Sequence, residues 1–273
     1  MDDRDLDRIA EQILERVEGG GPLPAHCSPL PSQLPGGTAE RRNGGTPLPA
    51  PGSLLPEKDL ASIIDHTNLK PEATRSDIYR LCGEAVEYGF FSVCVGGSWV
   101  EFCRDRLNGT DVRIVSVAGF PLGSDTSTMK AKQAAELVEI GADEVDMVAP
   151  IGRILDDDWY FVEDDIAAVV NAAGGRCVKV ILETAVLCPT RIVKASAIAM
   201  EAGAQFVKTS TGLHPAGGAS EEAVSLMNAA VGDRLGVKAA GGIRDRESAL
   251  RMVAAGATRI GTSSGVQIVR TAD

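Results

Sequence analysis

Two lysines in this sequence each close an apolar run and are followed at once by small residues. Lys208 stands in FVKTSTG (206–212) and Lys238 stands in VKAAGG (237–242). When a lysine is buried beside a second cation, its ammonium form is destabilised, its pKa falls and a free amine becomes available at neutral pH. A free amine attacks a carbonyl carbon to form a Schiff base, whose iminium helps to break the neighbouring C–C bond. The pair therefore predicts Schiff-base chemistry.

Other charged residues stand in similar apolar runs. Asp65 ends ASIID (61–65), Asp146 lies in EVDMV, and Lys179 and Glu183 lie in VKVILET. Because strand side chains alternate between two faces, the residues predicted to point into the interior are Asp146, Lys179, Glu183, Lys208 and Lys238. Asp146 is the nearest candidate for the proton relay that Schiff-base chemistry needs. Solvated charges or a structural ion-pair network are the alternative, but several inward charges on neighbouring strands favour a shared catalytic purpose.

Eight short apolar runs alternate with helical patterns from residue 57 onward. The runs are 61–65, 90–95, 112–120, 144–150, 177–184, 206–211, 236–242 and 258–264. Glycines that would close helices in a left-handed conformation precede four of the runs, at Gly89, Gly141, Gly203 and Gly256. Eight strand–helix units predict a parallel sheet that closes as a (β/α)₈ TIM barrel, with catalytic groups at the carboxyl ends of the strands. A doubly wound open sheet is the alternative, but no GxGxxG motif follows the first run.

Glycines and serines follow the last two predicted strands. AGGIRD comes after the seventh run, and GTSSG closes the eighth. The loops after these two strands, with a short helix N-terminus, are the usual phosphate site of the barrel fold. The candidate phosphate-binding residues are Gly241, Gly242, Gly261, Ser263 and Ser264. Plain turn glycines are the alternative, and the position of these residues on those two loops favours phosphate.

The composition of the chain favours small-molecule chemistry. Its 273 residues with 44% hydrophobic content can bury a sizeable core, and a net charge of −11 argues against a nucleic-acid binder. None of the six cysteines forms a CxxC pair and the three histidines are scattered, so we expect no metal, no cofactor and no disulfide framework. No apolar stretch approaches the roughly 18 residues of a membrane span, and the acidic N-terminus lacks a secretory apolar region. We expect a cytoplasmic protein.

The residues before the predicted barrel fall into two segments. Residues 1–18 place Leu6, Ile9, Ala10, Ile13, Leu14 and Val17 on the apolar stripe of an amphipathic helix. Residues 19–56 contain eight glycines and nine prolines without periodicity, which predicts a disordered linker. The predicted barrel domain then occupies residues 57–273.

Motifs throughout residues 57–273 together resemble deoxyribose-phosphate aldolases, which are class I aldolases. The motifs are DHTNLKPEAT, VCV, GFPLG, GADEVDMV, KVILET, KTSTG, VKAAGGIRD and RIGTSSG. The resemblance implies reversible retro-aldol cleavage of 2-deoxy-D-ribose 5-phosphate to D-glyceraldehyde 3-phosphate and acetaldehyde. It implies that Lys208 is the Schiff-base lysine, that Lys238 perturbs its pKa and that Asp146 relays protons through a water. The candidate substrate-binding residues are Asp65, Cys94, Lys179, Thr211 and Gly212.

Two departures from the family pattern leave substrate preference open. Some longer relatives carry a lysine just after KTSTG, near the phosphate, where this chain has Leu213. They also have a C-terminal tail that ends in tyrosine, whereas this sequence stops at Asp273. Cys94 is explained equally well as a small apolar core residue. The alternative functions are a Schiff-base barrel aldolase acting on another phosphosugar and a non-catalytic, shell-associated barrel. We expect a homo-oligomer.

The N-terminal helix needs a partner for its apolar stripe, because a lone helix of this length is marginal in water. One interpretation is docking on the enzyme's own barrel or across an oligomer. The other is that residues 1–18 resemble an encapsulation peptide, which directs enzymes into bacterial microcompartments by binding a shell protein. Encapsulation would confine the volatile, reactive acetaldehyde. A membrane-surface role is disfavoured, because the polar face of the helix is not rich in lysine or arginine.

Overall fold

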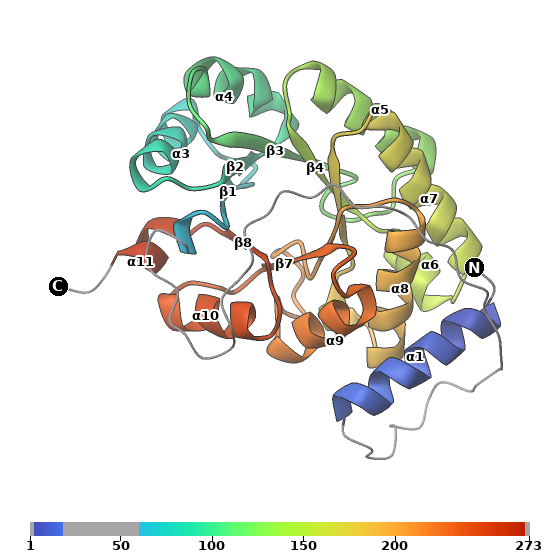
Figure 1. Cartoon of the computed structure of the whole chain (residues 1–273). Helices are drawn as coiled ribbons and strands as arrows, with labels where there is room; N and C mark the ends of the chain where they lie inside the picture. The colour runs from blue at the N-terminus through green and yellow to red at the C-terminus, as the bar shows by residue number, and fades with distance from the viewer. Residues whose placement is uncertain (1–2, 19–59, 271–273) are drawn as a thin grey trace.

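A computed structural model describes residues 3–18 and 60–270 and shows eight parallel strands in a closed barrel surrounded by helices (Figure 1). The strands follow chain order around the barrel, and β8 pairs with β1 to close it. They are β1 (Ile64–Asn68), β2 (Ser92–Val95), β3 (Arg113–Ala118), β4 (Glu144–Val148), β5 (Cys177–Ile181), β6 (Phe206–Lys208), β7 (Gly236–Ala240) and β8 (Arg259–Thr262). The predicted TIM barrel is confirmed, and the open-sheet alternative is wrong.

Seven of the eight predicted runs contain the whole observed strand, and the first is displaced. Strand β1 starts at Ile64 because residues 60–61 are helical and residues 62–63 form a turn. Asp65 was expected at the end of this strand, but it is the second residue and lies inside the barrel. Strand β5 stops at Ile181, so Glu183 does not follow strand alternation and instead has a left-handed φ of 55°.

Helices cover the outside of the barrel and connect successive strands. They are α3 (Arg75–Tyr88), α4 (Val100–Leu107), α5 (Ser127–Glu139), α6 (Ile151–Leu155), α7 (Trp159–Ala172), α8 (Pro189–Glu201), α9 (Glu221–Val231), α10 (Arg246–Ala254) and α11 (Gly265–Val269). All four glycines predicted to close helices have positive φ, for example 66° at Gly89, where α3 ends. None of the helices that the structure describes is long and apolar enough to cross a membrane.

The apolar core lies between the strands and the helix layer, and charged residues occupy the barrel interior. Val145, Met147, Val178 and Val180 are fully buried in the core. The side chains that alternate with them point into the barrel, as predicted. This division leaves the interior free for polar chemistry, because the core that stabilises the fold lies outside the ring of strands.

The N-terminal helix α1 (Asp3–Glu18) packs on the helix layer over α8 and α9 (Figure 1). Leu6, Ala10 and Leu14 are almost completely buried there. Asp7 forms an ion pair with Lys194 of α8. The predicted helix is therefore confirmed, and most of its apolar stripe is covered by the chain's own barrel, while Val17 near the end of the helix is 40% exposed. The predicted linker, residues 19–56, lies outside the described residues.

Candidate active site

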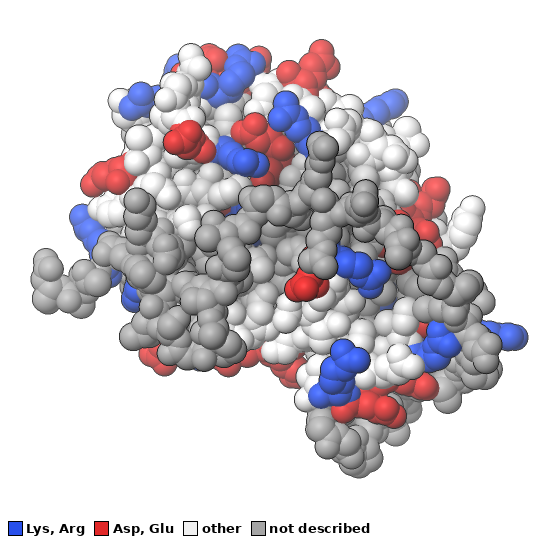
Figure 2. Space-filling model, in the orientation of Figure 1, with Lys and Arg blue, Asp and Glu red and all other residues white. Residues whose placement is uncertain are grey.

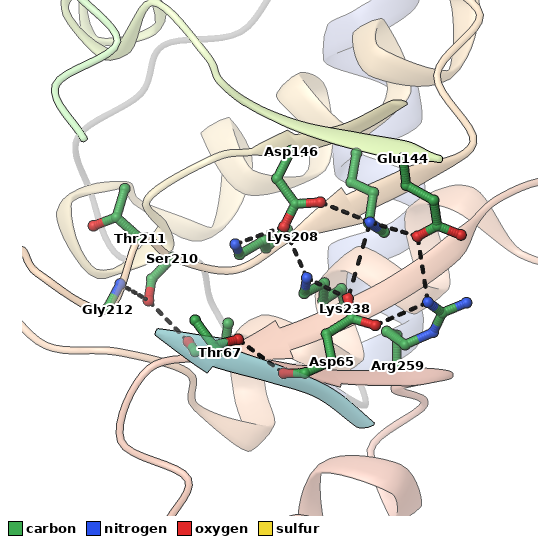
Figure 3. Close-up of polar contacts among 12 residues, drawn as sticks. Asp65, Thr67, Glu144, Asp146, Lys208, Ser210, Thr211, Gly212, Lys238 and Arg259 are labelled. Carbon is green, nitrogen blue, oxygen red and sulfur yellow. Dashed lines mark hydrogen bonds and ion pairs between the residues drawn. The ribbon is translucent and has the colours of Figure 1, made fainter. Parts of the chain in front are cut away.

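Asp146 of β4 is the centre of a buried cluster of charged side chains (Figure 3). Its Oδ2 accepts hydrogen bonds from the Nζ atoms of Lys208 and Lys238, at 2.8 Å each. Its Oδ1 accepts from the Nζ of Lys179 at 2.7 Å. Strand register explains this convergence, since Asp146 is paired with Lys179 and Lys208 with Lys238 on adjacent strands. The residues predicted to form the catalytic centre are thus brought together.

Asp65 is the second carboxylate of the cluster. It forms an ion pair with Lys238 and accepts a hydrogen bond from Arg259 Nη1 at 3.0 Å. The hydroxyl of Ser92 also donates to Asp65, at 2.7 Å. Asp65 is fully buried, and its ion pair holds Lys238, which is paired with Lys208 on the neighbouring strand.

Sequence reasoning missed two members of the cluster, Glu144 and Arg259. Glu144 Oε2 lies 2.7 Å from Lys179 Nζ and 3.4 Å from Arg259 Nη1. The barrel fold predicts catalytic charges near the carboxyl ends of strands, whereas these two residues begin β4 and β8. Strand alternation could have found Glu144, because it stands two residues before Asp146 and shares its face.

The electrostatics of the cluster separate Lys208 from the other two lysines. Burial lowers the pKa of Lys208, and the neighbouring Lys238 lowers it further, against the opposing effect of Asp146. Burial also acts on Lys238, but the carboxylates of Asp146 and Asp65 outweigh it and raise the pKa of Lys238. Carboxylates raise the pKa of Lys179 in the same way. Lys208 is therefore the lysine of the three that most readily becomes a free amine.

The loop after β6 is held rigidly against the loop after β7. Thr209 Oγ1 and Ser210 Oγ both donate to the carbonyl oxygen of Ala240, at 3.0 and 2.8 Å. Glu183 accepts a 2.6 Å hydrogen bond from Thr211 Oγ1. Gly241 has a left-handed φ of 90°, and a Cβ there would lie 2.4 Å from Ser210 Oγ. Small residues are thus required where the KTSTG and AAGG segments meet.

A cavity of about 520 Å³ opens above the cluster. Seven of the site residues predicted from the sequence line this cavity: Lys208, Thr211, Gly212, Gly241, Gly242, Gly261 and Ser263. Asp65, Cys94 and Lys179 are fully buried and do not line it, and neither does Ser264, which is the N-cap of α11. Cys94 lies close enough to Lys208 and Lys238 for their charges to affect its thiol, whose pKa is raised by burial.

The cavity wall also carries basic residues that sequence reasoning did not select. They are Lys70, Arg80 and Arg244. Arg80 is paired with Asp77 at 3.1 Å, and Arg244 stands two residues after Gly242 in the loop that follows β7. On the face in Figure 2, the described basic and acidic surface side chains intermingle. The cavity therefore supplies the local positive groups that an anionic substrate requires in an acidic protein.

Residues 60–272 match the family model described as DeoC/LacD family aldolase. The chain belongs to the DeoC/LacD aldolase family. Deoxyribose-phosphate aldolase of Thermococcus kodakarensis is 52% identical over 220 residues, which are 79% of this chain and 98% of that protein. The tetrameric deoxyribose phosphate aldolase structure from Aeropyrum pernix aligns with a TM-score of 0.73 and 35% identity, covering 78% of this chain and 90% of that one.

A second solved structure extends the similarity beyond the DeoC/LacD barrel. A Coccidioides immitis protein assigned as a deoxyribose-phosphate aldolase aligns with a TM-score of 0.80 and 36% identity. The alignment covers 98% of this chain and 97% of that one, so it spans most of α1.

Proposed function

We propose that this protein reversibly cleaves 2-deoxy-D-ribose 5-phosphate to D-glyceraldehyde 3-phosphate and acetaldehyde through a Schiff base on Lys208. The observation that carries the assignment is that Lys208, of the three lysines bound to Asp146, is the one that lines the cavity. Borohydride trapping with the phosphosugar, followed by peptide mapping, tests it. Label on another residue, or no label in a fully active enzyme, would overturn it.

The geometry supports a sequence of proton transfers around one amine. The Lys208 amine attacks C1 of the open-chain sugar, and loss of water gives the iminium. Removal of the C3 hydroxyl proton then breaks the C2–C3 bond, releases glyceraldehyde 3-phosphate and leaves an enamine on Lys208. Protonation of the enamine at C2 and hydrolysis release acetaldehyde and restore the amine. Asp146 Oδ2, 2.8 Å from both Lys208 and Lys238, is placed to pass these protons through a water.

The loops after β7 and β8, together with Arg244, are proposed to hold the phosphate. Gly241, Gly242 and Ser263 line the same cavity as Arg244. This arginine offers a positive charge in a chain that has the exposed Leu213 where some relatives have a lysine. Guanidinium groups suit phosphate because their donors match its oxygens.

Replacing Arg244 with alanine is expected to raise KM for deoxyribose 5-phosphate by at least about tenfold, since a hydrogen bond to a charged group contributes about 1.5–3 kcal/mol. KM for unphosphorylated 2-deoxyribose should change little. Arg80→Ala is the matched control, because Arg80 lines the same cavity but is already paired with Asp77. Equal losses for both sugars in Arg244→Ala would contradict phosphate binding.

Replacing Lys238 with leucine is expected to move the acid limb of the pH–rate profile upward. The Lys238 ammonium lowers the pKa of Lys208, so its removal raises the pH at which Lys208 becomes a free amine. The measurement is kcat/KM across a pH series, with Lys238→Arg as the control that keeps the charge. A profile that stays in place in Lys238→Leu would argue against this role.

The alternative functions are separated by their products. Release of acetaldehyde identifies deoxyribose phosphate chemistry, whereas a ketone product such as dihydroxyacetone phosphate identifies another phosphosugar. A non-catalytic barrel would release neither, and the retained cluster of Lys208, Lys238 and Asp146 argues against it. We also propose that this protein forms a homo-oligomer, as its tetrameric relative does. Light scattering in solution measures the oligomeric state and tests this proposal.

Encapsulation through residues 1–18 stays a prediction. The apolar stripe that a shell protein would bind is packed on α8 and α9. Helix α1 would therefore have to leave this surface before it could bind a shell protein. The test is to fuse residues 1–20 to a fluorescent protein in cells that make shells. Punctate fluorescence that co-purifies with shell proteins supports encapsulation, and diffuse fluorescence contradicts it.

A further inference from the structure

Glu144 and Arg259 extend the buried cluster to the N-terminal end of the barrel, away from substrate. Neither residue lines the cavity. Glu144 is 2% exposed and Arg259 is 7% exposed, and their closest charged atoms are 3.4 Å apart. The Arg259 guanidinium lies 3.4 Å from the centroid of the Phe91 ring, which fixes its position. A pair at this depth acts on the reaction only through the other charges.

The charges of the cluster do not balance when every group is ionised. The carboxylates are Asp65, Glu144 and Asp146, and the cationic groups are Lys179, Lys208, Lys238 and Arg259. Four cations against three carboxylates leave one excess positive charge. Uncompensated charge is costly in a dry interior, so the cluster favours the state in which one cation has lost its proton.

The contacts indicate which cation can lose its proton at the smallest electrostatic cost. Arginine stays charged at any ordinary pH. Lys179 lies within ion-pair distance of all three carboxylates, and Lys238 contacts two of them. Lys208 contacts one carboxylate, Asp146, and lines the cavity. The proton therefore leaves Lys208 at the smallest electrostatic cost.

We propose that Arg259 and Glu144 are positioning residues whose charges set this balance and so decide that Lys208 is a free amine. The inference rests on the proposed function, in which that amine is the nucleophile. Without Arg259, three carboxylates would face Lys179, Lys208 and Lys238, and the balanced state would be the one with Lys208 protonated. Without Glu144, the positive excess would grow and Lys208 would lose its proton more easily.

Other ionisable groups near Lys208 do not alter this count. The groups that act on Lys208 are Cys94, Asp146 and Lys238, and the cavity wall adds His66, Lys70, Asp77, Arg80, Glu84 and Arg244. Glu183 is buried but accepts from Thr211 and forms no ion pair with the described residues of the cluster. Burial keeps the Cys94 thiol neutral by raising its pKa, and lowers the pKa of His66. Arg113 lies 3.7 Å from Glu144, but it is 56% exposed and its charge is screened by solvent.

The test uses single and double variants and follows the pH dependence of Schiff-base formation. Arg259→Met should shift the acid limb upward by about one pH unit, and Glu144→Gln should shift it downward by a similar amount. In the double variant the two shifts should cancel, so its acid limb should lie close to that of the parent. Arg259→Lys is the matched control, because it keeps the charge, and its acid limb should stay near that of the parent.

The measurement is the rate at which borohydride and acetaldehyde modify Lys208 across a pH series, read by mass spectrometry. Opposite shifts that cancel in the double variant support the inference, because a merely structural role would slow both single variants without moving their limbs apart. Acid limbs that stay in place in both single variants, or that move in the same direction, overturn the inference. The proposed function still stands in that case if the parent enzyme is labelled at Lys208. Absence of label in the parent contradicts both. If Arg259→Met does not fold, the downward shift of the isosteric Glu144→Gln decides.

Discussion

Replacing Lys208 with alanine is expected to abolish turnover and borohydride labelling together while the barrel stays folded. Loss of the group that forms the covalent intermediate removes the whole chemical pathway, so we expect a fall in kcat of about four to six orders of magnitude. Folding should survive because Asp146 retains Lys179 at 2.7 Å and Lys238 at 2.8 Å. Activity assays, thermal unfolding and circular dichroism measure these three outcomes.

Lys70→Ala is the matched control for this experiment. Lys70 is the other lysine that lines the cavity, but it is exposed and lies outside the cluster around Asp146. Labelling of Lys208 should persist in Lys70→Ala and should be absent in Lys208→Ala. Residual turnover with label on Lys179 or Lys238 would show that the amine is supplied by a different lysine.

The barrel could be predicted because its evidence is repeated along the chain. Seven of the eight strands lie wholly within a predicted apolar run, and glycines such as Gly89 and Gly141 mark helix ends where φ is positive. Alternation along strands then placed Asp146, Lys208 and Lys238 on one face, which requires no knowledge of tertiary contacts. Both kinds of evidence come from residues close together in the sequence. Closing the barrel does not alter which residues form strands or which face each side chain takes.

The parts that could not be predicted depend on distances between segments remote in sequence. Arg259 joins the cluster because β8 closes on β1 and brings it within 3.0 Å of Asp65, which is 194 residues away in the chain. Asp65 lies inside β1 and not at its end because residues 60–61 are helical, which the apolar run ASIID does not reveal. Glu183 leaves the strand pattern because its left-handed backbone aims its carboxylate at Thr211.

The same limit applies to α1. Periodicity identified its apolar stripe, but a stripe does not specify its partner. The structure seats Leu6, Ala10 and Leu14 on α8 and α9, with Asp7 paired to Lys194. Any shell protein therefore competes with an interface that already exists within the chain.

Replacing Asp146 with asparagine is expected to lower kcat by about 10²–10⁴-fold, the usual contribution of general acid–base catalysis, while Lys208 still forms the Schiff base. Lys208 would lose its one carboxylate partner in the cluster, so its pKa should fall and the free amine should remain available. Borohydride labelling should therefore persist as turnover fails. Lys179 keeps Glu144 at 2.7 Å and Lys238 keeps Asp65, which allows the barrel to fold.

The matched control for Asp146→Asn is Asp165→Asn. Asp165 forms an equally buried pair with Lys130, at 2.8 Å, between α7 and α5 and away from the cavity. Breaking a buried pair costs about 3–5 kcal/mol in the free energy of unfolding, so both variants should be destabilised. Only Asp146→Asn should lose activity per folded molecule, because only Asp146 touches the reacting amine. Equal losses of kcat in the two variants would mean that Asp146 matters for folding alone, and retained turnover in Asp146→Asn would remove it from the proton relay.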